Sequence, residues 1–206
     1  MKLQHHFVRK VKLSDLVPTQ VAIGYLEVRA KQQEWNSLGK QERQQQMDKH
    51  WFPAVIGPGQ RYYIVDHHHT AMALQKVGEK FALVIAKHDW SALDCAIFWK
   101  TMEFHHFAHP YDAKGKRIPF KKMPQRVSEL SDDPFRGLVS VAQKAGAVAS
   151  ELPSLAQFLW ADYFRNNIPS KELRKGAAQA AVVKALELAK LQQASYLPGW
   201  SGNSDY

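Results

Sequence analysis

The segment Asp66-His67-His68-His69-Thr70 places a carboxylate, three imidazoles and a hydroxyl on five successive residues. An imidazole can donate to phosphate oxygens, transfer protons near neutral pH or bind a metal. The carboxylate can cap a helix, hold a histidine tautomer or ligate Mg²⁺. Three successive histidines point in different directions from a helix start, and we favour His68 and His69 over His67 as the reactive pair.

A strand and a helix are predicted on the two sides of this segment. Residues 62–65 are aromatic and β-branched, as in a strand, and residues 67–77 have helical spacing that Gly78 closes. A strand-to-helix turn directs backbone N–H groups and the positive end of the helix dipole at whatever lies over it. The sequence therefore predicts an anion site at this turn.

The whole chain reads as an α+β protein: a small mixed sheet with helices, followed by an all-helical C-terminal extension. We expect one domain over residues 1–90, the helical extension over 91–197 and a flexible tail over 198–206. Strands are predicted at residues 5–12, 53–56, 62–65 and 81–86, with a loop at 17–20. Helices are predicted at residues 23–38, 39–50, 67–77, 92–107, 135–145, 155–165 and 171–192.

Composition narrows the class of protein. The 206 residues suffice for a sizeable core, and the single cysteine, Cys95, excludes an intrachain disulfide and fits a reducing compartment. The basic N-terminus has no apolar run of the signal-peptide type, and no segment approaches the roughly 20 apolar residues that span a bilayer. We expect a cytoplasmic protein without membrane contact.

The formal charge of +9 favours anionic partners, either a phosphate-containing small molecule or a nucleic acid. Part of this charge is concentrated in residues 113–126, which contain six basic residues and no acid. Lys116 and Arg117 in this basic connection are candidate ligand contacts. A solvated loop is the alternative interpretation, and the sequence does not decide between the two.

A divalent metal, Mg²⁺ or a transition metal, is a further possibility. His105 and His109 are four residues apart near the end of a predicted helix, which is a spacing that can bind a metal, but the glutamate of the zinc-protease motif is absent. If the connection folds over the turn, His67 or His69 could combine with His109 and Asp112 in one metal site. The metal ligands that we select are Asp66, His69 and His109.

Residues 62–74, read as Tyr-x-Ile-Val-Asp-x-His-His-x-Ala-x-Ala-Leu, resemble the signature of the ParB/sulfiredoxin superfamily. Residues 11–20 are similar to its opening motif, in which a strand leads to a Pro-x-Gln loop. The resemblance covers roughly residues 8–90. The remainder resembles the helical extension of the bacterial ParB-like nuclease subgroup.

The resemblance implies phosphate chemistry, because members of the superfamily include CTP-binding partition proteins, free-serine kinases, sulfiredoxin and nucleases. In these proteins the matching turn contacts nucleotide phosphates, commonly with Gly first and Arg last, where this chain has His67 and Thr70. His68 stands at the position of sulfiredoxin's catalytic cysteine, so sulfinate reduction is not expected. Residues 130–195 contain no helix-turn-helix pattern, which argues against a chromosome-partition role.

Our leading hypothesis is an enzyme that acts on a phosphate-containing ligand, as a nucleotide-dependent phosphotransferase or as a nucleotide or phosphodiester hydrolase. The predicted catalytic residues are Asp66, His68, His69 and Glu27, although a solvated helix carboxylate explains Glu27 equally well. The predicted ligand contacts are Thr19, Gln20, Arg29, His67 and Thr70, with Lys116 and Arg117. The alternatives are a non-catalytic module that binds nucleotides or nucleic acid, and an interaction protein with an eroded site.

Overall fold

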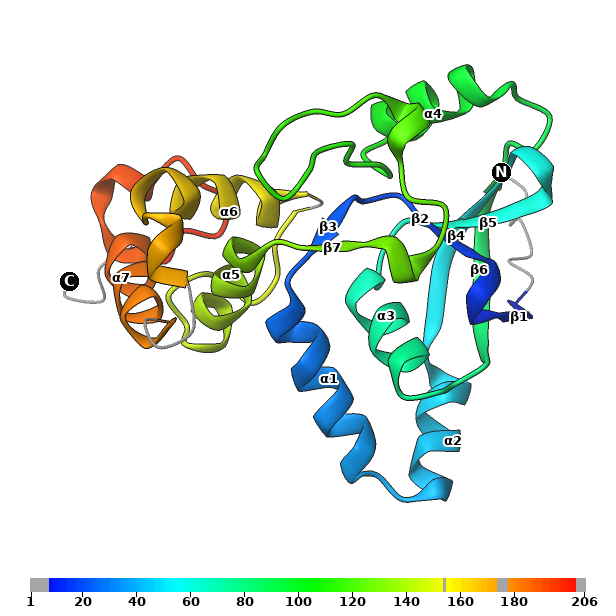
Figure 1. Cartoon of the computed structure of the whole chain (residues 1–206), viewed down its shortest axis with the longest axis horizontal. Helices are drawn as coiled ribbons and strands as arrows, with labels where there is room; N and C mark the ends of the chain where they lie inside the picture. The colour runs from blue at the N-terminus through cyan, green and yellow to red at the C-terminus, as the bar shows by residue number, and fades with distance from the viewer. Residues whose placement is uncertain (1–7, 154, 174–177, 203–206) are drawn as a thin grey trace, which may run out of the picture. The chain divides into compact units, whose positions relative to one another are not determined.

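The computed structural model describes residues 8–153, 155–173 and 178–202, which form two compact units (Figure 1). The described residues of the first unit are 8–22 and 28–131, and those of the second are 23–27 and 132–202, interrupted by the undescribed positions. The predicted fold class is confirmed, because a mixed sheet with helices is followed by C-terminal helices. The predicted domain boundary near residue 90 stays a prediction.

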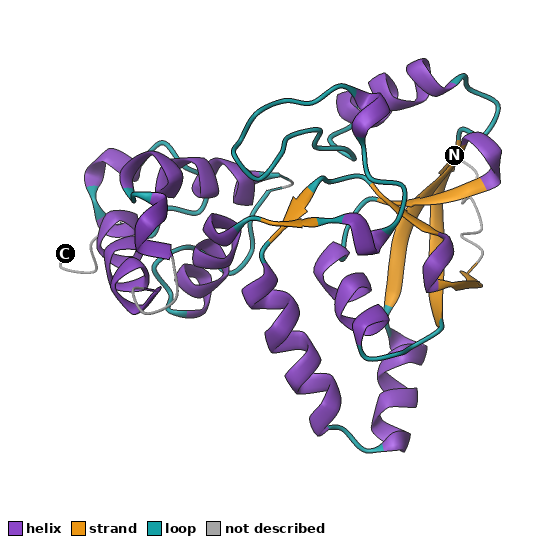
Figure 2. Ribbon diagram, in the orientation of Figure 1, coloured by secondary structure: helices purple, strands orange, loops and turns teal. Residues whose placement is uncertain are grey.

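The first unit is built on a five-stranded mixed sheet (Figure 2). Its strands in spatial order are β1 (Val8–Lys12), β6 (Phe81–Asp89), β4 (Trp51–Gly57), β5 (Arg61–Ile64) and β2 (Leu16–Pro18). The β1/β6 and β4/β5 pairs are antiparallel, and the β4/β6 and β2/β5 pairs are parallel. Residues 5–7 of the predicted first strand lie outside the described residues.

The edge strand β2 differs from the sequence-based expectation. The expected loop at residues 17–20 begins as the buried edge strand β2, in which Leu16 pairs with Tyr62 and Pro18 with Ile64. Local propensity misses this strand because its pairing partner is more than forty residues away, and an edge position tolerates the proline.

The first unit holds the helices α2 (Lys40–Lys49), α3 (His68–Lys76) and α4 (Cys95–Phe104), together with most of α1 (Tyr25–Ser37), whose first turn belongs to the second unit. Both faces of the sheet are covered. Val55 and Tyr63 pack in one core cluster with Phe98 of α4. Ala54 and Ile64 alternate with them along the strands and are fully buried as well, so the opposite face is also covered.

Gly57 at the end of β4 sets the distance between α4 and the sheet. A Cβ atom at this position would lie 2.5 Å from Cε2 of Tyr63 and 2.6 Å from Cε2 of Phe98. The two rings stack in a tilted pair with centroids 4.5 Å apart. Only the absence of a side chain at Gly57 allows this close approach.

The second unit is a helical bundle of α5 (Pro134–Lys144), α6 (Ala156–Asn167) and α7 (Ala178–Lys190). Two short strands, β3 (Ala22–Ile23) and β7 (Ser131–Asp132), pair where the chain passes between the units. The bundle core contains Trp160 and Phe164 of α6 in one cluster with Ala181, Ala185 and Ala189 of α7. The predicted helix 171–192 is a 3₁₀ turn, Ser170–Leu173, followed by α7; residues 174–177 lie outside the described residues.

Asp133 caps the start of α5. Asp133 accepts a hydrogen bond from the Phe135 N–H at 3.0 Å, and Pro134 occupies the first helical position. Arg165 of α6 pairs with Asp133 at 2.6 Å and also with Asp162. Desolvation by burial raises the pKa of Asp133 despite the opposing effect of Arg165.

Across the described part of the chain, no helix combines the length and apolar character needed to cross a membrane.

We expect Gly57→Ala to lower the free energy of unfolding by about 1–3 kcal/mol, because the new methyl group overpacks the contact between Tyr63 and Phe98. Urea denaturation measures the change. Gly39→Ala is the matched control, since its Cβ would meet only the flexible Glu42 carboxylate at 3.3 Å. Equal stability of the two variants would contradict this account of the close approach.

Candidate functional site

The turn at Asp66 is held by Thr19, which follows edge strand β2. The Thr19 N–H donates to Nε2 of His68 at 3.1 Å, and the Thr19 hydroxyl donates to the Ile64 carbonyl at 2.8 Å. The Thr19 carbonyl accepts the N–H of His109 at 2.9 Å. One buried threonine thus joins the ends of β2 and β5, the start of α3 and the connection that follows α4.

This network determines the state of His68. A nitrogen that accepts an N–H hydrogen bond carries no proton, so the ring is neutral, with its proton on Nδ1. The His68 side chain is only 2% exposed. In this conformation the ring positions the loop, and the catalytic role expected for His68 stays a prediction.

His67 and Asp66 form the exposed part of the turn. His67 has φ 63° and ψ 26°, in the left-handed region that costs a non-glycine residue about 1 kcal/mol or more. This geometry explains why the resemblance implies glycine at this position. Asp66 accepts the His67 N–H at 2.6 Å, and no side chain caps α3 at His67.

The ring of His67 contacts a histidine that the sequence analysis did not select. His50, which follows α2, lies edge-on to His67 with centroids 4.7 Å apart and to Phe52 at 4.9 Å. These contacts hold the strained turn against the start of β4. Nε2 of His50 is buried and has no hydrogen-bond partner among the described residues.

His50 and Thr70 also line a pocket of about 310 Å³ between α1, α2 and α3. Trp35 of α1 lines it too, and its Nε1 donates to Glu79 at 3.2 Å, while Arg43 of α2 donates to the Trp35 carbonyl at 3.0 Å. These bonds set α1 and α2 at the distance that leaves the pocket. The other lining residues are Lys31, Glu34, Gln46, Met47, Lys49, Ala73 and Leu74.

Burial keeps His50 neutral. Desolvation, followed by the nearby His67 and Lys31, lowers the pKa of His50 from 6.5 to about 4, and Asp66 acts weakly in the opposite direction. The pocket therefore has a neutral imidazole on its wall at physiological pH, next to the turn.

The remaining predicted residues are distributed as follows. Gln20 pairs with His109 in a short parallel bridge, so the connection does reach the Thr19-Gln20 loop, and the His109 ring stacks on Tyr111. Arg29 is exposed on α1, and Glu27 lies in the first turn of α1, within the second unit. The proposed roles of these residues stay predictions.

The basic connection is ordered on the first unit. Asp112 accepts the N–H groups of Lys114 and Lys116, both at 2.9 Å, and Arg117 pairs with Glu103 at 2.7 Å. Arg61 of β5 donates to the side chain and the carbonyl of Gln125. All six basic side chains of residues 113–126 are nevertheless exposed.

The expected helical histidine pair is not formed, because α4 ends at Phe104 and His109 lies beyond it, outside the helix. Within the described ranges, no group of three or more His, Cys, Asp or Glu residues is placed to hold a metal ion. The predicted set of Asp66, His69 and His109 gains no support from this geometry and stays a prediction.

Sequence reasoning found Thr70 but missed His50, Lys31 and Lys49. No spacing links these residues to the turn, because they come from α1 and α2 and meet α3 only in the folded chain. One weak signal was present: His50 stands between a strongly polar helix and an apolar strand.

This fold and turn define a ParB-like domain. The model of the family described as "Putative ParB-like nuclease" matches residues 9–166, and the chain therefore belongs to this family. A crystal structure of protein Atu1540 from Agrobacterium tumefaciens is similar, with a TM-score of 0.90 and 33% sequence identity, over 97% of this chain and 99% of that one. No curated protein matches the chain.

We expect His68→Ala to lower the free energy of unfolding by about 2–4 kcal/mol, because it creates a cavity and leaves the Thr19 N–H buried without an acceptor. His69→Ala, on the same turn but less buried, should cost less than about 1 kcal/mol. Denaturant unfolding of both variants measures this difference. A fully stable His68→Ala protein would show that the network around Thr19 does not hold the turn.

The depressed pKa of His50 predicts an acid-dependent loss of stability. Between about pH 6.5 and 4 the unfolded chain binds a proton that the folded chain does not, so stability is full above this window and falls as pH falls through it. Between pH 7.5 and 4.5, the His50→Gln protein should lose about 1 kcal/mol less of its free energy of unfolding than the unaltered protein. The expected difference is this small because the His50 ring is partly solvated. The test is urea unfolding at pH 7.5 and 4.5, with His105→Gln as control, and an unchanged pH dependence in His50→Gln would contradict the prediction.

Proposed function

We propose that this chain binds a phosphate-containing ligand at the α3 turn and in the adjoining pocket, and hydrolyses a phosphoester or phosphoanhydride bond of that ligand. The observation that carries the proposal is that the pocket shares Thr70 with the first turn of α3 and brings Lys31 and Lys49 to the same place. A helix N-terminus, two ammonium groups and a hydroxyl together suit an anionic oxygen cluster.

The size and lining of the pocket favour a nucleotide over free phosphate. A volume of about 310 Å³ admits a group much larger than phosphate, and Trp35, Met47 and Leu74 supply apolar surface for a base. The carboxylate of Glu34 can accept hydrogen bonds from a hydroxyl or amino group of such a ligand. The family description, which names a nuclease, supports the same class of substrate.

The neutral imidazole of His50 acts as the general base in this proposal. An imidazole that stays unprotonated down to about pH 4 can accept a proton from an attacking water. Because its Nε2 has no partner among the described residues, a ligand can reorient the ring without breaking a hydrogen bond. In this proposal His69 and Asp66, on the exposed side of the turn, orient the water or the phosphate.

A divalent ion fits this arrangement best as Mg²⁺ that arrives with the substrate. Mg²⁺ is usually held by one or two carboxylates together with substrate phosphates and water, so Asp66 could serve as its protein ligand. When bound, the ion would neutralise charge on the phosphate. A transition-metal site uses three or more protein ligands. Within the described residues, no group of three or more His, Cys, Asp or Glu side chains is placed to hold such an ion.

The double variant Lys31→Gln/Lys49→Gln should weaken nucleotide binding at least about tenfold, because two charge-assisted contacts are lost. Thermal shift with nucleoside triphosphates and Mg²⁺ measures binding, and phosphate release measures turnover. His50→Gln should retain binding and lose about 10²- to 10⁴-fold in kcat. Lys40→Gln, exposed on α2 outside the pocket, is the control.

Unchanged nucleotide binding in the double variant would show that the pocket is not part of the ligand site. Transfer of the phosphoryl group to an added acceptor, without phosphate release, would show a phosphotransferase and overturn the hydrolase assignment. Binding without turnover under any metal condition would leave the chain as a binding module.

A further inference from the structure

A cluster of four aromatic rings lies away from the pocket, where the end of β6 meets the end of α4. His88 stacks on Trp90 with centroids 4.7 Å apart and planes 14° apart. His105 and Phe107 stack in the same way at 5.7 Å and 23°. Trp90 joins the two pairs at 5.2 Å from His105. We call these four residues the aromatic platform.

The platform is anchored on its inner side. Trp90 and Phe107 pack against the core cluster formed by α4 and the sheet. Backbone hydrogen bonds fix both segments: the Trp90 N–H donates to Ile56 at 2.8 Å, and the Phe107 N–H donates to Met102 at 2.8 Å. The inner rings are therefore held rigidly before any ligand arrives.

The outer side of the platform is not explained by core packing. His88 and His105 are exposed, and Phe104, edge-on to His105 at 5.2 Å, is 79% exposed. A phenylalanine ring in water loses the free energy that burial would provide. Exposed aromatic side chains such as His88, His105 and Phe104 are groups on which unpaired nucleic-acid bases can stack.

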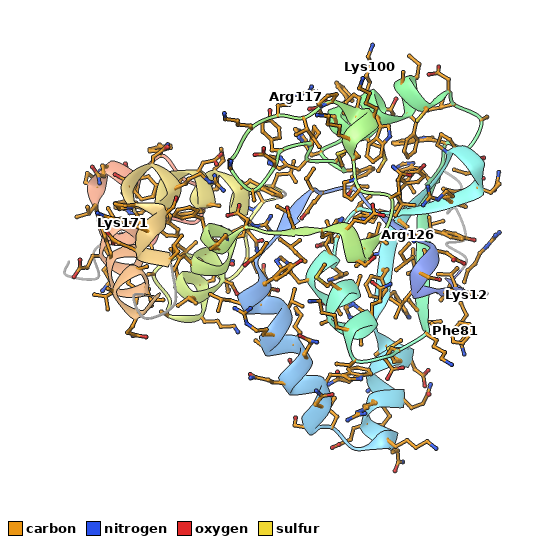
Figure 3. The ribbon with its side chains drawn as sticks, in the orientation of Figure 1. Lys12, Phe81, Lys100, Arg117, Arg126 and Lys171 are labelled. Carbon is orange, nitrogen blue, oxygen red and sulfur yellow. The ribbon has the colours of Figure 1, made fainter. Side chains whose placement is uncertain are left out.

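The charges around the platform fit a polyanion. Phe104, Lys100 and His106 line a hollow beside the platform together with Glu103, and the carboxylate of Glu103 is paired with Arg117. Figure 3 shows Lys100 and Arg117 at the same end of the first unit, over α4 and the connection. The exposed lysines and arginines of residues 113–126 extend this positive charge.

We propose that the aromatic platform is a base-stacking site for single-stranded nucleic acid, with its phosphates running along Lys100 and the basic connection. A duplex would not fit, because its bases are already stacked and their faces are unavailable. The inference goes beyond the proposed function and does not depend on it, since no platform residue lines the pocket.

The test is fluorescence anisotropy with a labelled oligo-dT strand of about 15 nucleotides and a duplex of equal length, both at low salt. The single strand should bind at least about tenfold more tightly than the duplex. The double variant Phe104→Ala/His105→Leu should weaken single-strand binding by about 5- to 100-fold. The control Tyr196→Ala removes an aromatic side chain that is 72% exposed in the second unit, and it should bind as the unaltered protein does.

Two further variants separate stacking from charge and from general loss of structure. His105→Tyr keeps an aromatic face and should retain binding that His105→Leu loses. Lys121→Gln/Lys122→Gln should lower the slope of log affinity against log salt by about 0.7 for each phosphate contact removed. Lys31→Gln/Lys49→Gln should bind the single strand normally, so that failure of the pocket proposal and failure of this one can be told apart.

Several results would overturn the proposal. These are no binding at low salt, equal affinity for single strand and duplex, or platform variants that bind as tightly as the unaltered protein. Concentration-dependent self-association abolished by Phe104→Ala, without single-strand binding, would instead assign the exposed rings to a protein contact.

Discussion

The hydrogen bonds of Thr19 are the constraint on which the rest of the first unit depends. Its N–H, hydroxyl and carbonyl connect to His68, Ile64 and His109, which come from three separate parts of the chain. A buried threonine with every polar group satisfied contributes both stability and a unique arrangement, because each alternative would leave a polar group unpaired. The position of the α3 turn follows from this one residue.

The turn itself stores strain that its surroundings offset. His67 adopts a left-handed conformation that glycine would adopt without cost, and its ring contacts His50 and lies near Phe52. Strained residues persist where neighbouring packing determines them, and they gather at functional sites. Here the histidine that replaces the expected glycine joins the turn to the wall of the pocket.

Two chemically different surfaces thus share one scaffold. The pocket between α1, α2 and α3 has two lysines and a neutral imidazole. The aromatic platform at the end of α4 has two exposed histidines and lies near Lys100. Gly57 contributes to the aromatic platform, because the absence of a side chain lets Phe98 pack closely against β4. This contact fixes the position of α4 on the sheet. The proposed phosphate pocket and the proposed base-stacking surface both suit the family description, which names a ParB-like nuclease.

Short-range features were determined by the sequence alone: the strand–turn–helix at Asp66, the helix at residues 135–145, the α+β class and the ParB-like motif. Each of these predictions depends on residues a few positions apart, whose spacing predicts the local structure directly. The tertiary structure decided that His68 turns inward and that His50 borders the pocket. It also decided that His88, Trp90, His105 and Phe107 come together in one aromatic cluster. The Thr19–His68 bond joins residues 49 positions apart. The direction in which a side chain points depends on the distant segment that packs against it. Local periodicity in the sequence does not identify that segment.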